Sequence, residues 1–69
     1  MFLTIETELE DDGRWIGDVP ELPGVLVHAG SEAEAAAKVE ALALRVLADL
    51  LDHGESRLVD VTIRVAAAE

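Results

Sequence analysis

The heptapeptide Asp18-Val19-Pro20-Glu21-Leu22-Pro23-Gly24 constrains the fold more than any other stretch of the chain. Each proline fixes its own φ and disfavours helical geometry for the residue before it, so Val19 and Leu22 must be extended. Gly24 lets the backbone leave in a direction that other residues rarely adopt. This heptapeptide, called the corner below, therefore predicts a fixed turn between two short apolar runs.

Upstream of the corner, residues 3–9 alternate apolar and polar side chains, which is the period of a strand with one buried face. Asp12-Gly13 is typical of a tight hairpin turn, because both residue types tolerate positive φ. A second strand over residues 14–19 should then return antiparallel to the first. We expect its aromatic side chain, Trp15, to be at least half buried, and Gly17 to mark a bulge or a close backbone approach.

Downstream of the corner, Val25-Leu26-Val27-His28 predicts a third strand. Ser31 and Glu34 then have the spacing of a capping box, in which the serine oxygen accepts from the amide of Glu34 while the carboxylate reaches back to the amide of Ser31. The helix that follows should run from about Glu32 to His53 and stop at Gly54.

This helix carries more apolar surface than one sheet can cover. At about 100° per residue, one stripe faces the sheet and comprises Ala35, Val39, Leu42, Ala43, Val46 and Leu50. A second arc comprises Ala33, Ala37, Leu44, Leu47, Ala48 and Leu51. The remaining sector holds oppositely charged residues four positions apart, Glu34 with Lys38 and Arg45 with Asp49. We interpret Leu44, Leu47 and Leu51 as a contact between copies of the chain in a homo-oligomer; the alternatives are burial among loops or a groove for a partner protein.

Residues 58–65 predict a fourth strand, with Val59, Val61, Ile63 and Val65 inward and Asp60, Thr62 and Arg64 outward. The element order β-β-β-α-β indicates a single α+β domain over residues 1–69. A right-handed crossover through the helix places the fourth strand beside the first and parallel to it. We therefore predict a four-stranded mixed sheet of order 3-2-1-4, with the long helix on one face and a polar surface on the other.

The composition limits what this domain can do. A chain of 69 residues without cysteine has a small core and no disulfides, so self-association is the simplest added source of stability. Its 15 acidic and 5 basic residues give a net charge of -10, which argues against direct binding to nucleic acid and favours a basic protein partner. No stretch has the character of a membrane span or a secretory leader, so we expect a cytoplasmic protein.

Most of the negative charge lies in residues 1–21. We predict that a partner-binding surface is formed by Glu6, Glu8, Asp11, Asp12, Trp15, Asp18 and Glu21. Trp15 could instead be a core residue. The carboxylates could also form a two-metal nuclease site, but each occupies a position where an outward strand face or a turn explains it. His28 and His53 have no metal-binding companion on their own elements, so we expect no metal, no cofactor, no catalytic residue and no enzymatic activity.

Three segments carry a family resemblance: Asp12-Gly13-Arg14-Trp15, the corner from Val19 to Gly24, and Gly30-Ser31 with Glu34-Ala35 at the start of the helix. Together they resemble the N-terminal domain of HicB antitoxins over about residues 3–53. The resemblance implies a partial ribonuclease-H-like fold without nuclease activity. It also implies binding to a small basic HicA-type toxin, related to double-stranded-RNA-binding domains, whose catalytic histidine is occluded so that mRNA cleavage stops.

The chain also departs from that family. Val25 stands where cysteine is frequent, and Ala33 occupies a position that is usually acidic. Full-length members usually add a C-terminal DNA-binding domain, and we expect this chain to lack it and not to bind an operator directly. The alternative function is therefore an orphan HicB-like domain, without a toxin, that serves as a homo-oligomeric binding or structural protein.

Overall fold

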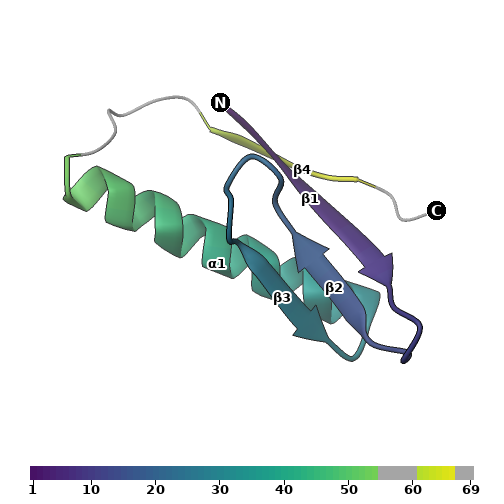
Figure 1. The fold of residues 1–69 in the computed structure, drawn as a ribbon. Coiled ribbons are helices and arrows are strands. Elements are labelled where there is room, and N and C mark those ends of the chain that lie inside the picture. Colours follow the sequence, from purple (N-terminus) through teal and green to yellow (C-terminus); the bar gives the residue numbers. More distant parts are fainter. Residues whose placement is uncertain (55–60, 67–69) are drawn as a thin grey trace.

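The computed structural model describes residues 1–54 and 61–66. Its elements are β1 (Phe2–Leu9), β2 (Trp15–Asp18), β3 (Leu26–Ala29), α1 (Glu32–Asp52) and β4 (Thr62–Val65). The strands form one mixed sheet in the order β3-β2-β1-β4, and α1 lies across one face of it (Figure 1). The predicted α+β class, element order and strand order are confirmed. The predicted start of the fourth strand, residues 58–60, lies outside the described residues.

β1 pairs with different strands in its two halves. Residues 2–5 pair in parallel with β4, from Phe2 opposite Thr62 to Ile5 opposite Val65. Residues 6–9 pair antiparallel with β2, which in turn pairs antiparallel with β3. The first half of β1 therefore has β4 on one edge and the corner, rather than a strand, near the other.

The loop between β1 and β2 is a tight hairpin turn, as Asp12-Gly13 predicts, and its hydrogen bonds define its type. The Glu10 amide donates to the Arg14 carbonyl (2.8 Å), and the Gly13 amide donates to the Glu10 carbonyl (3.0 Å). Gly13 has a φ of 87°, whereas Asp12 does not have a positive φ. Both residue types tolerate positive φ, but this three-residue loop needs left-handed geometry only at its last position, Gly13.

The corner is tied by its own backbone and contributes to the core. The Leu22 amide donates to the Val19 carbonyl (2.9 Å), and the Val25 amide donates to the Leu22 carbonyl (3.1 Å). Gly24 has a φ of 88°, as the expected change of direction requires. Val19, Leu22 and Val25 are all buried. The prolines therefore fix a loop that turns three apolar side chains inward.

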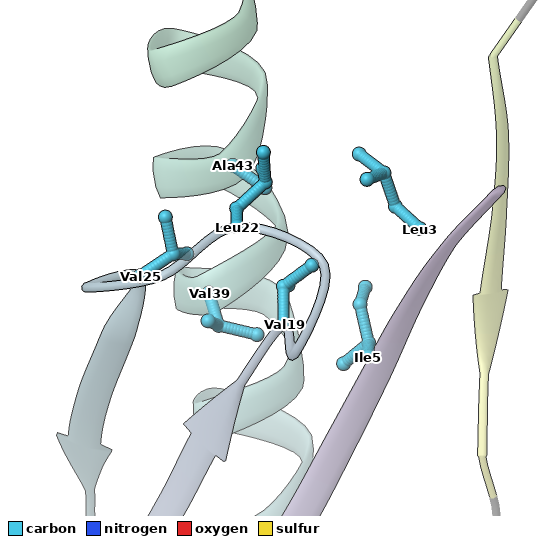
Figure 2. Packing of buried hydrophobic residues seen from close by; sticks show 7 residues of the cluster. All are labelled: Leu3, Ile5, Val19, Leu22, Val25, Val39 and Ala43. Atoms are coloured by element: carbon cyan, nitrogen blue, oxygen red, sulfur yellow. The ribbon is translucent and has the colours of Figure 1, made fainter. Parts of the chain in front are cut away.

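The core lies between α1, the corner and β1. Figure 2 shows the side chains of its buried cluster pointing toward one another: Leu3, Ile5, Val19, Leu22, Val25, Val39 and Ala43. The stripe predicted to face the sheet is confirmed for five of its six residues, since Ala35, Val39 and Ala43 are buried and Leu42 and Val46 pack against this cluster. Leu50, the sixth, is partly buried but does not belong to the cluster.

α1 approaches the sheet closely at Gly17. A Cβ atom added at Gly17 would lie 2.6 Å from the carbonyl oxygen of Ala35 and 3.2 Å from the Cβ of Val39. Of the two expectations for a glycine within β2, the close backbone approach is therefore confirmed. The absence of a side chain at this position lets the helix backbone rest on the strand.

The ends of α1 follow the prediction with one correction. The Glu34 amide donates to the Ser31 hydroxyl (3.1 Å), but the Glu34 carboxylate accepts from the Gly30 amide (2.8 Å) and not from that of Ser31. Ser31 has an extended backbone (φ −146°, ψ 161°). The amide within reach of the Glu34 carboxylate is therefore that of Gly30, one residue before the cap. At the other end α1 finishes at Asp52, one residue before the predicted end, and His53 caps it ahead of Gly54, whose φ is 70°.

The charged pairs predicted on α1 are only partly formed. Lys38 Nζ lies 3.6 Å from the Glu34 carboxylate, so the first pair is confirmed. Asp49 instead contacts His53, whose Nδ1 lies 3.3 Å from its carboxylate, and the predicted pair with Arg45 is wrong. The same Nδ1 of His53 lies 2.8 Å from the backbone carbonyl oxygen of Asp49, so the imidazole contacts both the backbone and the side chain of this residue at the end of the helix.

β4 is less buried than its sequence predicts. Ile63 packs against the core, but Val61 and Val65 are exposed, so their predicted burial is wrong. Val65 shares the helix side of the sheet with its neighbour Ile5, yet α1 packs on β1, β2 and β3. The alternating pattern therefore predicts which β4 side chains lie on the helix side of the sheet, but it does not predict whether α1 covers them. Val59 and Asp60 lie outside the described residues.

Candidate functional site

The face of the sheet opposite α1, called the open face below, gathers three of the predicted acidic residues. Leu3 and Ile5 of β1 point toward the helix, so Glu6 and Glu8 point away from it. The register places Asp18 directly opposite Glu6 and Ile16 directly opposite Glu8. The open face therefore brings together Glu6, Glu8 and Asp18 from two adjacent strands.

These three carboxylates have no cationic partner among the residues that the structure describes. Side chains directly opposite on antiparallel strands have Cβ atoms about 5 Å apart, and like charges in that arrangement destabilise the pairing. The pair Glu6 and Asp18 is therefore unfavourable by itself. A positive group placed between them would relieve the repulsion.

The open face is not uniformly polar, which corrects the expectation. Leu26 lies beside Asp18, with 49 % of its surface exposed, and Phe2 is 59 % exposed. The guanidinium of Arg64 lies 5.2 Å from the centroid of the Phe2 ring, a cation–π distance. Ile16, between Glu8 and His28, adds a third apolar side chain. Sequence reasoning did not assign these residues, although the alternation that turns Leu3 inward turns Phe2 outward.

Glu21, another predicted contact residue, has an internal role. Its carboxylate accepts from the Thr4 amide and from the Thr4 hydroxyl, both at 2.9 Å. β2 ends at Asp18, so no strand reaches this edge of Thr4, and the side chain supplies the missing acceptor. The Thr4 amide is the main cause of the lowered pKa of Glu21, with smaller contributions from its own backbone, the Thr4 hydroxyl and the charge of Arg64.

Replacement of Glu21 by glutamine should make the protein less stable at neutral pH and less sensitive to acid. A carboxylate whose pKa is lowered on folding stabilises the fold above its ordinary value of 4.5, and that stability is lost as pH falls through the lowered value. Urea unfolding at pH 7 and pH 3 should therefore show a smaller pH difference for Glu21→Gln than for the unchanged protein. Glu8→Gln on the open face is the control, and an equal effect from it would contradict the role of Thr4.

The remaining predicted contact residues do not lie with these carboxylates. Asp11 and Asp12 are at the hairpin tip, where Asp12 contacts the Arg14 guanidinium at 3.0 Å. The Arg14 backbone amide, followed by its side chain, lowers the pKa of Asp12. Trp15 is opposite Leu9 and Ala29 on the helix side of the sheet and is partly buried, as predicted. The seven predicted residues therefore divide between the open face, the hairpin tip, the corner and the helix side.

The three leucine residues predicted to form an oligomer contact differ in how far they are exposed. Leu44 and Leu51 are 48 % and 43 % exposed, whereas Leu47 is partly buried against the core. Ala33, Ala37 and Ala48 of the same arc are exposed. The outer side of α1 is therefore an apolar surface centred on Leu44 and Leu51, with Leu47 at its border with the core.

The two histidines lie beside single carboxylates. His28 Nε2 is 3.4 Å from the Glu10 carboxylate, and His53 contacts Asp49. Within the described part of the chain, no three His, Asp or Glu side chains gather closely enough to hold a metal ion. The helix at residues 32–52 is not apolar enough to cross a membrane, and the described residues contain no other helix.

Comparison of the chain with models of known protein families, with curated proteins and with solved structures gives no match. The resemblance to HicB antitoxins therefore depends on its three motif segments alone. In the structure these segments form the β1–β2 loop with the start of β2, the corner, and the capped start of α1.

Proposed function

We propose that this chain is an antitoxin-like protein-binding module that acts in the cytoplasm. It would bind a small basic, mRNA-cleaving toxin of HicA type and occlude the active site of that toxin. The proposal assigns no catalytic step to the chain itself, because neutralisation requires only that the toxin surface be covered.

One observation carries this proposal: Glu6, Glu8 and Asp18 lie together on the open face, and none of the described residues supplies them with a cationic partner. Lysine or arginine side chains of a basic partner would pair with these carboxylates and relieve the repulsion between Glu6 and Asp18. The net charge of -10 would also speed the encounter with such a partner. The resemblance in the corner and the helix cap supplies the class of partner.

The test measures RNA cleavage by a basic HicA-type protein encoded in the reading frame adjacent to this chain. We expect equimolar chain to abolish cleavage, and the double substitution Glu6→Lys/Glu8→Lys to weaken inhibition at least tenfold. Both glutamates are exposed and outside the core, so this variant should remain folded. The affinity of the unchanged protein should also fall as salt is raised, because surface charges are screened.

The matched control is Asp49→Lys/Asp52→Lys, which changes the net charge by the same amount on the last turns of α1. Cations near a helix C-terminus are tolerated, so the fold should be kept, and inhibition should stay unchanged. Equal loss in both variants would show that net charge alone drives binding and that the open face is not the site. Undiminished RNA cleavage, or the absence of such a gene, would refute the antitoxin function.

A further inference from the structure

The outer side of α1 has the spacing of a helix-pairing seam. Positions 33, 37, 40, 44, 47 and 51 are separated alternately by four and three residues, as in the apolar seam of a coiled coil. Leu44 and Leu51 stand on this seam with nearly half of their surface exposed. All of the seam residues except Glu40 are alanine or leucine, so a single charge interrupts an otherwise apolar seam.

Residue size changes along this surface in a regular way. Its first half carries the small residues Ala33 and Ala37 followed by Glu40, and its second half carries Leu44, Leu47 and Leu51. Two parallel copies would place leucine against leucine in one half and leave alanine against alanine in the other. Two antiparallel copies would bring the leucine half of each helix onto the alanine half of the other, with leucine against leucine only at the centre, which fills space more evenly along the pair.

We propose that two copies of this chain form a dimer by antiparallel pairing of α1 about a two-fold axis at Leu44. In this register Leu44 meets Leu44 of the other copy, and Leu51 meets Ala37 of the other copy. The Leu44 contact lies on the axis and occurs once, whereas the contact between Leu51 and Ala37 occurs twice, as a two-fold interface requires. The surface is thus complementary to itself, which identifies a second copy as its occupant.

Charge favours the same arrangement. In a parallel pair Glu40 would face Glu40 of the other copy inside an apolar contact, whereas in the antiparallel pair it faces Ala48. The opposed helix dipoles also attract. Glu6, Glu8 and Asp18 lie on the open face, opposite α1, so pairing through the helix keeps the most repulsive surfaces of the two copies apart.

The contact is small, because α1 has 21 residues and offers only its outer side. Interfaces that bury less than about 1,200 Å² in total are characteristic of weak complexes, so we expect dissociation in the micromolar range. This inference is independent of the toxin proposal, since it uses the opposite side of the molecule and concerns the chain alone.

Sedimentation across a range of protein concentrations tests the dimer. We expect Leu44→Asp/Leu51→Asp to remain monomeric at concentrations at which the unchanged protein is dimeric. The control Leu9→Asp/Leu26→Asp alters two leucines of similar exposure on the sheet and should leave the dimer intact. A protein that is monomeric throughout, or a dimer insensitive to the α1 substitutions, would overturn the inference. Circular dichroism establishes that each variant is folded.

Cross-linking tests the direction of the helices, because the chain has no native cysteine. With a short bis-maleimide, Leu44→Cys should cross-link to itself. An equimolar mixture of Ala37→Cys and Leu51→Cys chains should cross-link to each other, while each alone should not. Self-cross-linking of Leu51→Cys without the mixed product would indicate parallel pairing, and a failure of Leu44→Cys to cross-link would place the axis elsewhere; either result refutes the proposed geometry.

Discussion

Replacement of Gly17 by alanine should lower the midpoint of thermal unfolding by roughly 4–24 °C, since overpacking costs about 1–3 kcal/mol and each kcal/mol shifts the midpoint of a domain of this size by about 4–8 °C. The new Cβ would lie 2.6 Å from the Ala35 carbonyl oxygen and 3.1 Å from its carbon. These are helix backbone atoms, so no side chain can rotate to make room. α1 must therefore move away from β2, which weakens the packing of the helix on the core.

The control for this substitution is Gly30→Ala. A Cβ atom at Gly30 would have its nearest neighbour, a carboxylate oxygen of Glu34, at an ordinary distance of 3.7 Å. We expect this variant to unfold within a few degrees of the unchanged protein in the same calorimetric scan. If Gly17→Ala unfolded at the same temperature as Gly30→Ala, the close approach of α1 and β2 would be disproved.

Replacement of Leu3 by alanine should have a comparable or larger effect, about 2–5 kcal/mol of unfolding free energy. Leu3 has no exposed surface and lies in the cluster between β1, the corner and α1. The total stability of a domain of this length is on the order of 3–10 kcal/mol, so the loss could unfold much of the protein at 37 °C. Urea unfolding followed by Trp15 fluorescence measures it.

The same substitution at Leu9 is the matched control, because this residue lies on the same strand and is 55 % exposed. Substitutions at exposed positions usually change stability by less than about 0.5 kcal/mol. The two variants should therefore differ by several-fold in their shift of the urea midpoint. Equal shifts would mean that Leu3 is not at the centre of the core.

Much of this fold could be predicted from local patterns. Alternation in β1 identified the buried positions Leu3 and Ile5, the serine cap fixed the start of α1, and the handedness of the crossover fixed the position of β4. The close backbone approach at Gly17 could be predicted because a glycine within a strand usually marks either a bulge or such an approach. These features depend on residues near in sequence or on a general rule of chirality.

The errors concern geometry that no local pattern contains. The hydrogen bond from the Gly30 amide to the Glu34 carboxylate depends on the backbone conformation of Ser31. The exposure of Val65 depends on how much of the sheet α1 covers. The candidate site was predicted only in part for the same reason. The charge of the acidic residues marks them as contact candidates. Trp15 is not on the open face, because alternation along β2 turns its side chain to the helix side. Glu21 is not available there, because its carboxylate accepts a hydrogen bond from the Thr4 amide.

The divided pairing of β1 sets an order for assembly. β1, β2, β3 and α1 follow one another along the chain and contact their neighbours directly, so closing these contacts requires only short loops. The first half of β1, by contrast, pairs with residues about sixty positions later, since Phe2 is opposite Thr62. Contacts of such long range form slowly. Folding should therefore begin as a three-stranded unit with its helix, and β4 should join last and exchange its amide hydrogens first.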